Sequence, residues 1–397
     1  MTQNSELDLV ACFVCQSNEF ERIDLNQNLL DASDFHNSQH NPSGYSYFLA
    51  TCKKCGHSAI HTDNPCLLPT RKYDFIKYGE PTEYYPKISN ILRSLKLNSG
   101  DISIHCFSNK DFQLANFLAT DLGISDLKLN NYAGCSDDWL PVTSSDGSKR
   151  GPIPLDQFIT ELQNSAKSHQ VILITRFFDH VANHDLLQKI LDLSSPTRHF
   201  VFDLNDYDRL FDLDTVEFIW NERRNLLRHS DIESILRRTN LKYSIFAYES
   251  QEVSPTLTGV ISERLHASPK SNSTPSNLPV SHLVKKLIML RQRWQDKLAK
   301  THKLGIIGAS HKGVSLAQFV LGRHVQYSLH DDKESLKGKT PPVNPPLGFH
   351  LFSGFDFSGY THIAITTTHV IAVQIIPKLR ALGYNGEILD FDCRRLD

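Results

Sequence analysis

Short apolar runs alternate with amphipathic segments along the middle of the chain, from about residue 85 to residue 265. The apolar runs predict strands at 101–106, 127–130, 170–175, 198–204 and 241–249. Between them, apolar residues at helical spacing predict helices at 112–123, 154–168, 185–195 and 228–240. This alternation predicts a mostly parallel sheet covered by helices.

A second α/β pattern follows a segment rich in Ser, Pro and Asn at 266–280, which we interpret as a flexible linker. Ser281 suits the N-cap of a helix that runs to about His302. Its apolar stripe predicts core packing, and it consists of Leu283, Leu287, Leu290, Trp294 and Leu298. Strands at 304–307, 325–331, 362–368 and 387–392 then complete a small parallel lobe. We therefore expect domains at 1–84, 85–265 and 281–397.

Two C-x2-C pairs stand in the amino-terminal part of the chain, Cys12 with Cys15 and Cys52 with Cys55. Each pair directs two thiolates at one centre, so the two pairs together form a tetrahedral sulfur site suited to zinc. Four thiolates leave no position for a catalytic water, and we expect a structural metal that supplies folding free energy. The alternative is two chance pairs of reduced thiols.

The charge and hydropathy of the chain indicate which kinds of molecule it binds. The 397 residues carry 42 basic and 44 acidic side chains, a net charge of -2, so no basic field favours nucleic acid or an anionic membrane. The first residues form no signal peptide, and no apolar run has the length to span a bilayer. We expect a cytoplasmic protein with a small-molecule partner.

The order of parts resembles a known family. The cysteine pairs, the α/β core, the segments TRFFDHV (175–181) and VEFIWNERRNLLRHSDIESILRRTNL (216–241) and the C-terminal lobe look like those of the three-part sugar C-methyltransferases. The resemblance implies a class I methyltransferase-like Rossmann core, flanked by a small zinc-binding domain and a C-terminal Rossmann-like α/β domain. It also implies S-adenosylmethionine as the methyl donor and a nucleotide-linked deoxysugar as the substrate.

The turn after the first predicted strand differs from the family pattern. His105 stands where an acidic residue is usual and Phe107 where a glycine is usual, followed by Ser108 and Asn109. Glycine permits close approach of the backbone to the donor, and we expect the Phe107 ring to intrude on that space. Asn130 or Asn131 stands where the family tends to place a carboxylate for the ribose, and an amide lacks that charge. The resemblance thus predicts weakened donor binding.

The resemblance places candidate catalytic residues at His180, Glu222 and Arg223. Arg223 stands where the family has a histidine base, and a guanidinium remains protonated and cannot remove a proton beside a ketone. The alternative interpretations are a surface histidine beside Asp179 and an ordinary ion-paired loop for Glu222 and Arg223.

A glycine-containing turn in the C-terminal lobe resembles the family's YGAxxKG loop, with Gly308, Lys312 and Gly313 in place, and Asp331 ends the next strand. The turn suits a phosphate or one wall of a substrate cleft. The alternative is a glycine turn needed only for close packing of helix on strand.

Three hypotheses follow from the sequence. The first is a sugar C-methyltransferase with an unusual donor loop. The second is a member of the same family that no longer transfers methyl groups and acts as a binding or scaffold protein. The third is a reaction without cofactor, carried by His180, Glu222 and Arg223 in the same cleft.

Overall fold

The fold is taken from a computed structural model of the chain. It describes residues 11–29, 36–37, 45–62, 82–129, 142–143, 149–150, 155–179, 184–212, 225–238, 241–248, 255–265, 280–298, 303–309, 311–321, 325–332, 339–340, 349–352, 355–367 and 369–397. None of the helices in these ranges is both long enough and apolar enough to cross a membrane.

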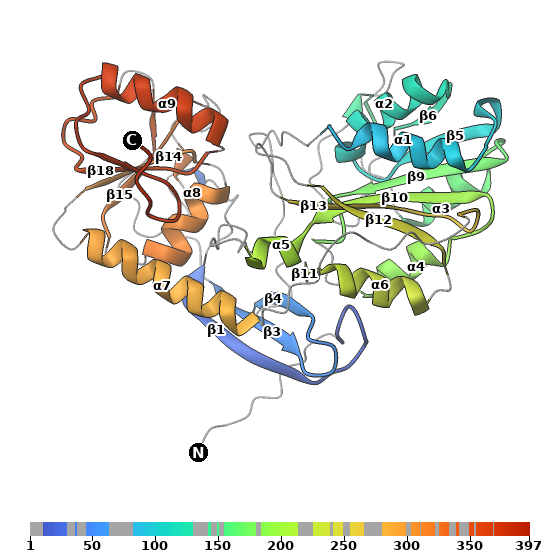
Figure 1. The fold of residues 1–397 in the computed structure, drawn as a ribbon, viewed down its shortest axis with the longest axis horizontal. Helices are drawn as coiled ribbons and strands as arrows, with labels where there is room; N and C mark the ends of the chain where they lie inside the picture. Colours follow the sequence, from blue (N-terminus) through green and yellow to red (C-terminus); the bar gives the residue numbers. More distant parts are fainter. Residues whose placement is uncertain are drawn as a thin grey trace.

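The middle of the chain forms a six-stranded sheet in the order β12-β13-β10-β9-β5-β6 (Figure 1). Its strands are β5 (Ile102–Cys106), β6 (Asp126–Lys128), β9 (His169–Thr175), β10 (Arg198–Asn205), β12 (Tyr243–Tyr248) and β13 (Thr256–Ile261). Strands β6, β5, β9 and β10 are parallel, whereas β13 runs antiparallel to both of its neighbours. One reversed strand near the edge of an otherwise parallel sheet makes this core class I methyltransferase-like.

Helices cover both faces of this sheet, which explains why its strands are apolar on both sides. Helices α1 (Tyr85–Ser94) and α2 (Phe112–Leu122) pack on one face, where the cluster includes Ile104 and Val171. The other face packs against α3 (Leu155–Gln163), α4 (His184–Leu191) and α6 (His229–Arg238). A short 3-10 helix at Ser99–Asp101 leads into β5, and another at Asn109–Asp111 leads into α2.

The C-terminal lobe is a five-stranded parallel sheet in the order β17-β15-β14-β18-β19. Its strands are β14 (Leu304–Ile307), β15 (Tyr327–Asp331), β17 (Phe349–Leu351), β18 (His362–Ile365) and β19 (Glu387–Leu389). Its helices are α8 (His311–Ser315), which continues as a π-helix at Leu316–Leu321, and α9 (His369–Ala381). The strand order reverses between β14 and β18, as expected for a Rossmann-like lobe.

The amino-terminal part forms an antiparallel sheet of β1 (Phe20–Leu29), β3 (Tyr45–Cys52) and β4 (Ser58–Thr62). The strand β11 (Asn225–Leu226), which belongs to the middle of the chain, completes this sheet by pairing with β4. Two short ladders complete the described pairings: β2 (His36–Asn37) with β16 (Lys339–Thr340), and β7 (Val142–Thr143) with β8 (Lys149–Arg150).

Helix α7 (Val280–Leu298) joins the three parts through one hydrophobic cluster (Figure 1). The five residues of the predicted stripe are all buried there, at 8% exposure or less. The cluster contains Leu49 and Ile60 of the amino-terminal sheet, Phe211 of α5 (Tyr207–Asp212) and Leu304 of the C-terminal lobe. Because this one cluster takes residues from all three parts, we expect the parts to unfold together.

Candidate functional site

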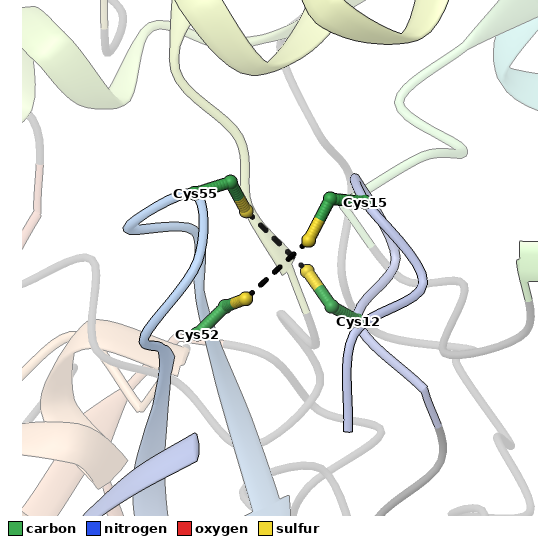
Figure 2. A group of neighbouring side chains, drawn as sticks. All are labelled: Cys12, Cys15, Cys52 and Cys55. Carbon is green, nitrogen blue, oxygen red and sulfur yellow. Dashed lines mark hydrogen bonds between the residues drawn. The ribbon is translucent and has the colours of Figure 1, made fainter. Parts of the chain in front are cut away.

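Four cysteine sulfurs converge on one point in the amino-terminal part (Figure 2). The Sγ atoms of Cys12 and Cys55 are 3.6 Å apart, those of Cys15 and Cys52 are 3.5 Å apart, and all four lie within 4.8 Å of one another. Zinc–sulfur bonds of about 2.3 Å give a tetrahedron with edges of about 3.8 Å. The four cysteines therefore fit a structural zinc ion.

The two cysteine pairs sit on turns of the same shape. In the first turn the amide of Gln16 donates to the carbonyl of Cys12, and in the second the amide of Gly56 donates to that of Cys52. Gln16 and Gly56 both have left-handed backbones, with φ of 61° and 76°. We call these turns, residues 12–17 and 52–57, the first and second knuckle. Their shared geometry is the reason that both pairs point at one centre.

The thiols interact even before a metal binds. The thiols of Cys12 and Cys55 share a hydrogen bond, and this contact lowers the pKa of Cys12 to about 4 and raises the pKa of Cys55. Burial raises the pKa of Cys15. Zinc requires all four sulfurs as thiolates, so we expect its binding to release protons at neutral pH.

His57 fixes the second knuckle to the core. Its ring is 2% exposed, with Nδ1 3.2 Å from Asp231 Oδ2 and Nε2 3.3 Å from Asn225 Oδ1. Burial lowers the pKa of His57, but the hydrogen bond and charge of Asp231 outweigh burial and raise the pKa above its usual value. Each ring nitrogen faces a side-chain oxygen, and the protonated ring would donate to both and pair with the Asp231 carboxylate.

The carboxyl ends of β5 and β9 lie where the strand order of the core reverses. Open α/β sheets bind ligands in a crevice at such a position, and we call this position the strand-end crevice. Here the carboxylate of Asp111 occupies it. One carboxylate oxygen accepts from the amides of Phe107 and Ser108, at 2.8 and 2.6 Å. The other accepts from the amide and hydroxyl of Thr175, at 2.7 and 2.6 Å. The Asp111 side chain thus binds the backbone amides at the carboxyl ends of β5 and β9, which we call the strand-end amides.

Asp111 is completely buried in this position. Burial raises the pKa of Asp111 to about 7 against the opposite pull of its four hydrogen bonds. The residue precedes α2, where an aspartate ordinarily caps the helix, but its side chain makes no capping hydrogen bond with that helix. Instead it links the turn after β5 to the end of β9.

The Phe107 ring packs among other aromatic side chains. Its ring is 1% exposed and packs edge-on against Phe158 of α3, at 5.2 Å, and against Phe177, at 4.6 Å. The ring therefore belongs to the hydrophobic core. The group that occupies the strand-end amides is the Asp111 carboxylate.

The remaining predicted donor-binding residues divide into two groups. The His105 ring is buried, its Nε2 lies 2.9 Å from Ser103 Oγ, and burial lowers its pKa to about 4. Ser108 is buried within the turn, where its hydroxyl accepts from the amide of Lys110, and Asn109 begins the 3-10 helix. Asn130 and Asn131 lie outside the described residues.

The predicted catalytic residues His180, Glu222 and Arg223 also lie outside the described residues. The described part of the chain includes Asp179, just before His180, and Asn225, two residues after Arg223. The amide of Asn225 donates to the carbonyl of Asp179 at 3.0 Å. The assignment of His180, Glu222 and Arg223 as catalytic residues stays a prediction.

A buried polar network surrounds the turn after β9. Arg176 has a left-handed backbone, with φ of 52°, and its amide donates to Asp203 Oδ1 at 2.7 Å. Its guanidinium donates to Asn205 Oδ1 at 3.0 Å and to Thr256 Oγ1 at 2.9 Å. The Tyr84 hydroxyl donates to Asp203 at 2.5 Å, and burial raises the pKa of Tyr84 well above its usual value. These hydrogen bonds join the turn after β9 to the ends of β10 and β13.

The glycine turn of the C-terminal lobe packs closely on its helix. Gly308 has φ of +99°, and a Cβ on Gly313 would lie 2.1 Å from the Gly308 carbonyl oxygen. The Asp331 carboxylate accepts from the amide of Ala309 at 3.0 Å, and Lys312 is half-buried. Close packing by itself accounts for both glycines, in line with the simpler of our two interpretations.

Three residues of these sites were missed from the sequence. Asp111 carried the ordinary pattern of a helix cap, His57 was one of several histidines near the cysteines, and Arg176 follows a strand without any motif. Each of these three residues is held by a buried hydrogen-bond partner that is distant in the sequence, so no local pattern identifies it.

No family model matches this sequence, and no curated protein matches it. Similar solved structures include the methyltransferase domain of bacterial CtHen1, which is 12% identical over 46% of this chain and 98% of that chain, with a TM-score of 0.32. Another is the plantazolicin methyltransferase BpumL in complex with SAH, which is 16% identical over 46% of this chain and 88% of that chain, with a TM-score of 0.26. At these values the similarities carry no argument about activity, and the methyltransferase-like fold rests on strand order.

Proposed function

We propose that this protein is a zinc-containing, methyltransferase-fold protein that binds a small molecule and does not transfer methyl groups from S-adenosylmethionine. The observation that carries the proposal is the Asp111 carboxylate at the switch point of the sheet. The amides of Ser108 and Thr175 and the Thr175 hydroxyl are bound there within the chain, as is the amide of Phe107, which also donates to the Leu173 carbonyl of the sheet.

Displacing Asp111 is costly for a ligand. A donor molecule that approached these amides would have to break four hydrogen bonds and leave a fully buried carboxyl group without partners. An anionic ligand would also meet like charge whenever Asp111 is ionised. Both effects disfavour the binding pose that the fold class ordinarily uses.

The resemblance in sequence supports a nucleotide-linked sugar as the class of small molecule. The C-terminal lobe supplies a second Rossmann-like sheet with Asp331 at the end of β15, and α7 packs this lobe and the core into one cluster. Two such sheets provide two strand-end edges, and the Asp111 carboxylate occupies the one in the core.

The decisive experiment is calorimetric titration of zinc-loaded protein with S-adenosylmethionine, with its demethylated product, and with a panel of nucleotide-linked deoxysugars. We expect neither donor compound to bind with a Kd below about 100 μM, and at least one nucleotide-sugar to do so. Tight donor binding together with methyl transfer to a sugar would refute the proposal and restore the methyltransferase hypothesis.

Turnover of a nucleotide-sugar without any donor would favour the reaction without cofactor. Alanine substitution at His180 or Glu222 would then abolish that turnover, while binding of the sugar persisted. If the protein binds nucleotide-sugars without changing them, the binding or scaffold function stands.

A further inference from the structure

The second knuckle is joined to the core by buried polar contacts that continue to the turn after β9, residues 176–179. His57 begins this path, because its backbone carbonyl accepts from the amide of the zinc ligand Cys52 at 2.8 Å. Its ring meets Asn225 Oδ1 at 3.3 Å and Asp231 Oδ2 at 3.2 Å, and all three side chains are 5% exposed or less. The ring has two anchors in the core.

Asn225 carries the path onward. Its side-chain amide donates to the carbonyl of Phe178 at 3.1 Å, and its backbone amide donates to the carbonyl of Asp179 at 3.0 Å. Two successive carbonyls of the turn after β9 are therefore held by one residue. The same residue pairs with Ala59 in the amino-terminal sheet, so the strand β11 is shared between the two parts.

The first knuckle reaches the same turn through an apolar contact surface. Phe13 lies between the ligands Cys12 and Cys15 and is 4% exposed. Phe13 and Phe178 line one small apolar cavity, together with residues of α6 and the sheet. Both knuckles therefore meet the segment that follows β9, one by hydrogen bonds and one by packing.

The turn itself is strained and needs external support. Arg176 holds a left-handed backbone, with φ of 52°, that non-glycine residues rarely adopt. On one side the turn is bound to β10 through Asp203 and Asn205, and on the other it is bound to Asn225. The preceding residue, Thr175, donates to Asp111 in the strand-end crevice.

We propose that the zinc knuckles hold the turn after β9 in place through His57 and Asn225, so that metal occupancy and the geometry of the strand-end crevice are coupled. His57 and Asn225 act as positioning residues in this coupling. Since coupling between two sites is reciprocal, loosening the turn must also weaken the hold on the metal. The inference does not depend on which ligand the crevice accepts.

The test is hydrogen exchange by mass spectrometry on the full chain, zinc-loaded and after removal of the metal with a chelator. We expect amides in the peptide covering 173–179 to exchange roughly fivefold faster or more without zinc, while those of β6 and α2 at the far edge change little. Equal exchange at 173–179 in the two states would overturn the proposal.

Asn225→Leu is the uncoupling variant, because it keeps the backbone hydrogen bond and removes both side-chain contacts. In this variant the response of 173–179 to zinc should shrink to a small fraction of the wild-type response. Persistence of the full response would count against the path through Asn225.

A second measurement covers the case in which the metal-free protein unfolds as a whole. The rate at which a colorimetric chelator withdraws zinc should rise roughly fivefold or more in Asn225→Leu. Thr51→Val is the matched control, since it removes a 3.0 Å contact with Ser58 inside the same sheet and leaves the core contacts in place. Equal rates in the two variants would show that the knuckles hold zinc independently of the turn.

Discussion

Replacing Asp111 by alanine should destabilise the protein strongly, because one carboxylate serves four buried donors. A typical intramolecular hydrogen bond contributes about 0.5–1.5 kcal/mol, and a buried donor left without an acceptor costs about 1–3 kcal/mol. Water that enters the vacated space restores part of this loss. We expect the free energy of unfolding to fall by about 3–5 kcal/mol.

Urea denaturation followed by tryptophan fluorescence and circular dichroism measures this loss. Asp192→Ala is the matched control, because Asp192 is exposed, accepts a surface hydrogen bond from Gln188 and should contribute much less. Formate should raise the stability of the Asp111→Ala variant and leave the wild type unchanged, since its carboxylate can replace the missing one.

The loss should also depend on pH in a definite direction. The pKa of Asp111 is raised from 3.8 to about 7, so the folded state binds this proton more tightly than the unfolded chain. Its contribution to stability is therefore full below about pH 4 and declines as the pH rises through 7. Asp111→Ala should cost more at pH 5 than at pH 8. A loss below about 1 kcal/mol at both values would refute the role that we assign to Asp111.

Three further predictions concern the knuckle, the C-terminal turn and the buried histidines. In urea denaturation, Gly56→Ala should lower the free energy of unfolding by about 1 kcal/mol, because φ is +76° and no atom obstructs a Cβ. Gly359→Ala is the control: this position is equally open but has an ordinary φ, so the change should have almost no effect. Gly313→Ala should cost about 2–3 kcal/mol by the same measurement, since its Cβ collides with a backbone carbonyl, and a neutral result would contradict the close packing of α8. Burial lowers the pKa of His330 from 6.5 to about 3. The neutral ring therefore contributes to the free energy of unfolding above pH 6.5, and this contribution, at most about 5 kcal/mol, is lost as the pH falls toward 3. His330→Gln should flatten that part of the curve of stability against pH.

Local spacing in the sequence determined the elements of this protein. The two C-x2-C pairs predicted the sulfur cluster, because each turn is formed by neighbouring residues. The stripe along α7 predicted its buried face for the same reason, since helical periodicity places the stripe on one side. Strands β5, β9 and β10 followed from their continuous apolar runs. The strand β13 was missed, because its small polar residues interrupt the apolar pattern at Thr256 and Thr258.

Only the tertiary structure decided what occupies the strand-end crevice. Asp111 and Thr175 are 64 positions apart, and His57 and Asn225 are 168 apart, so no local pattern indicates that either pair meets. Such contacts depend on strand order and on the register between sheets, which the packing of the whole chain establishes. Apolar periodicity and the spacing of the cysteines therefore predicted an α/β architecture with a four-cysteine cluster, and the methyltransferase-like strand order followed from the structure. The tertiary structure placed one buried carboxylate, that of Asp111, on the backbone amides where β5 and β9 end.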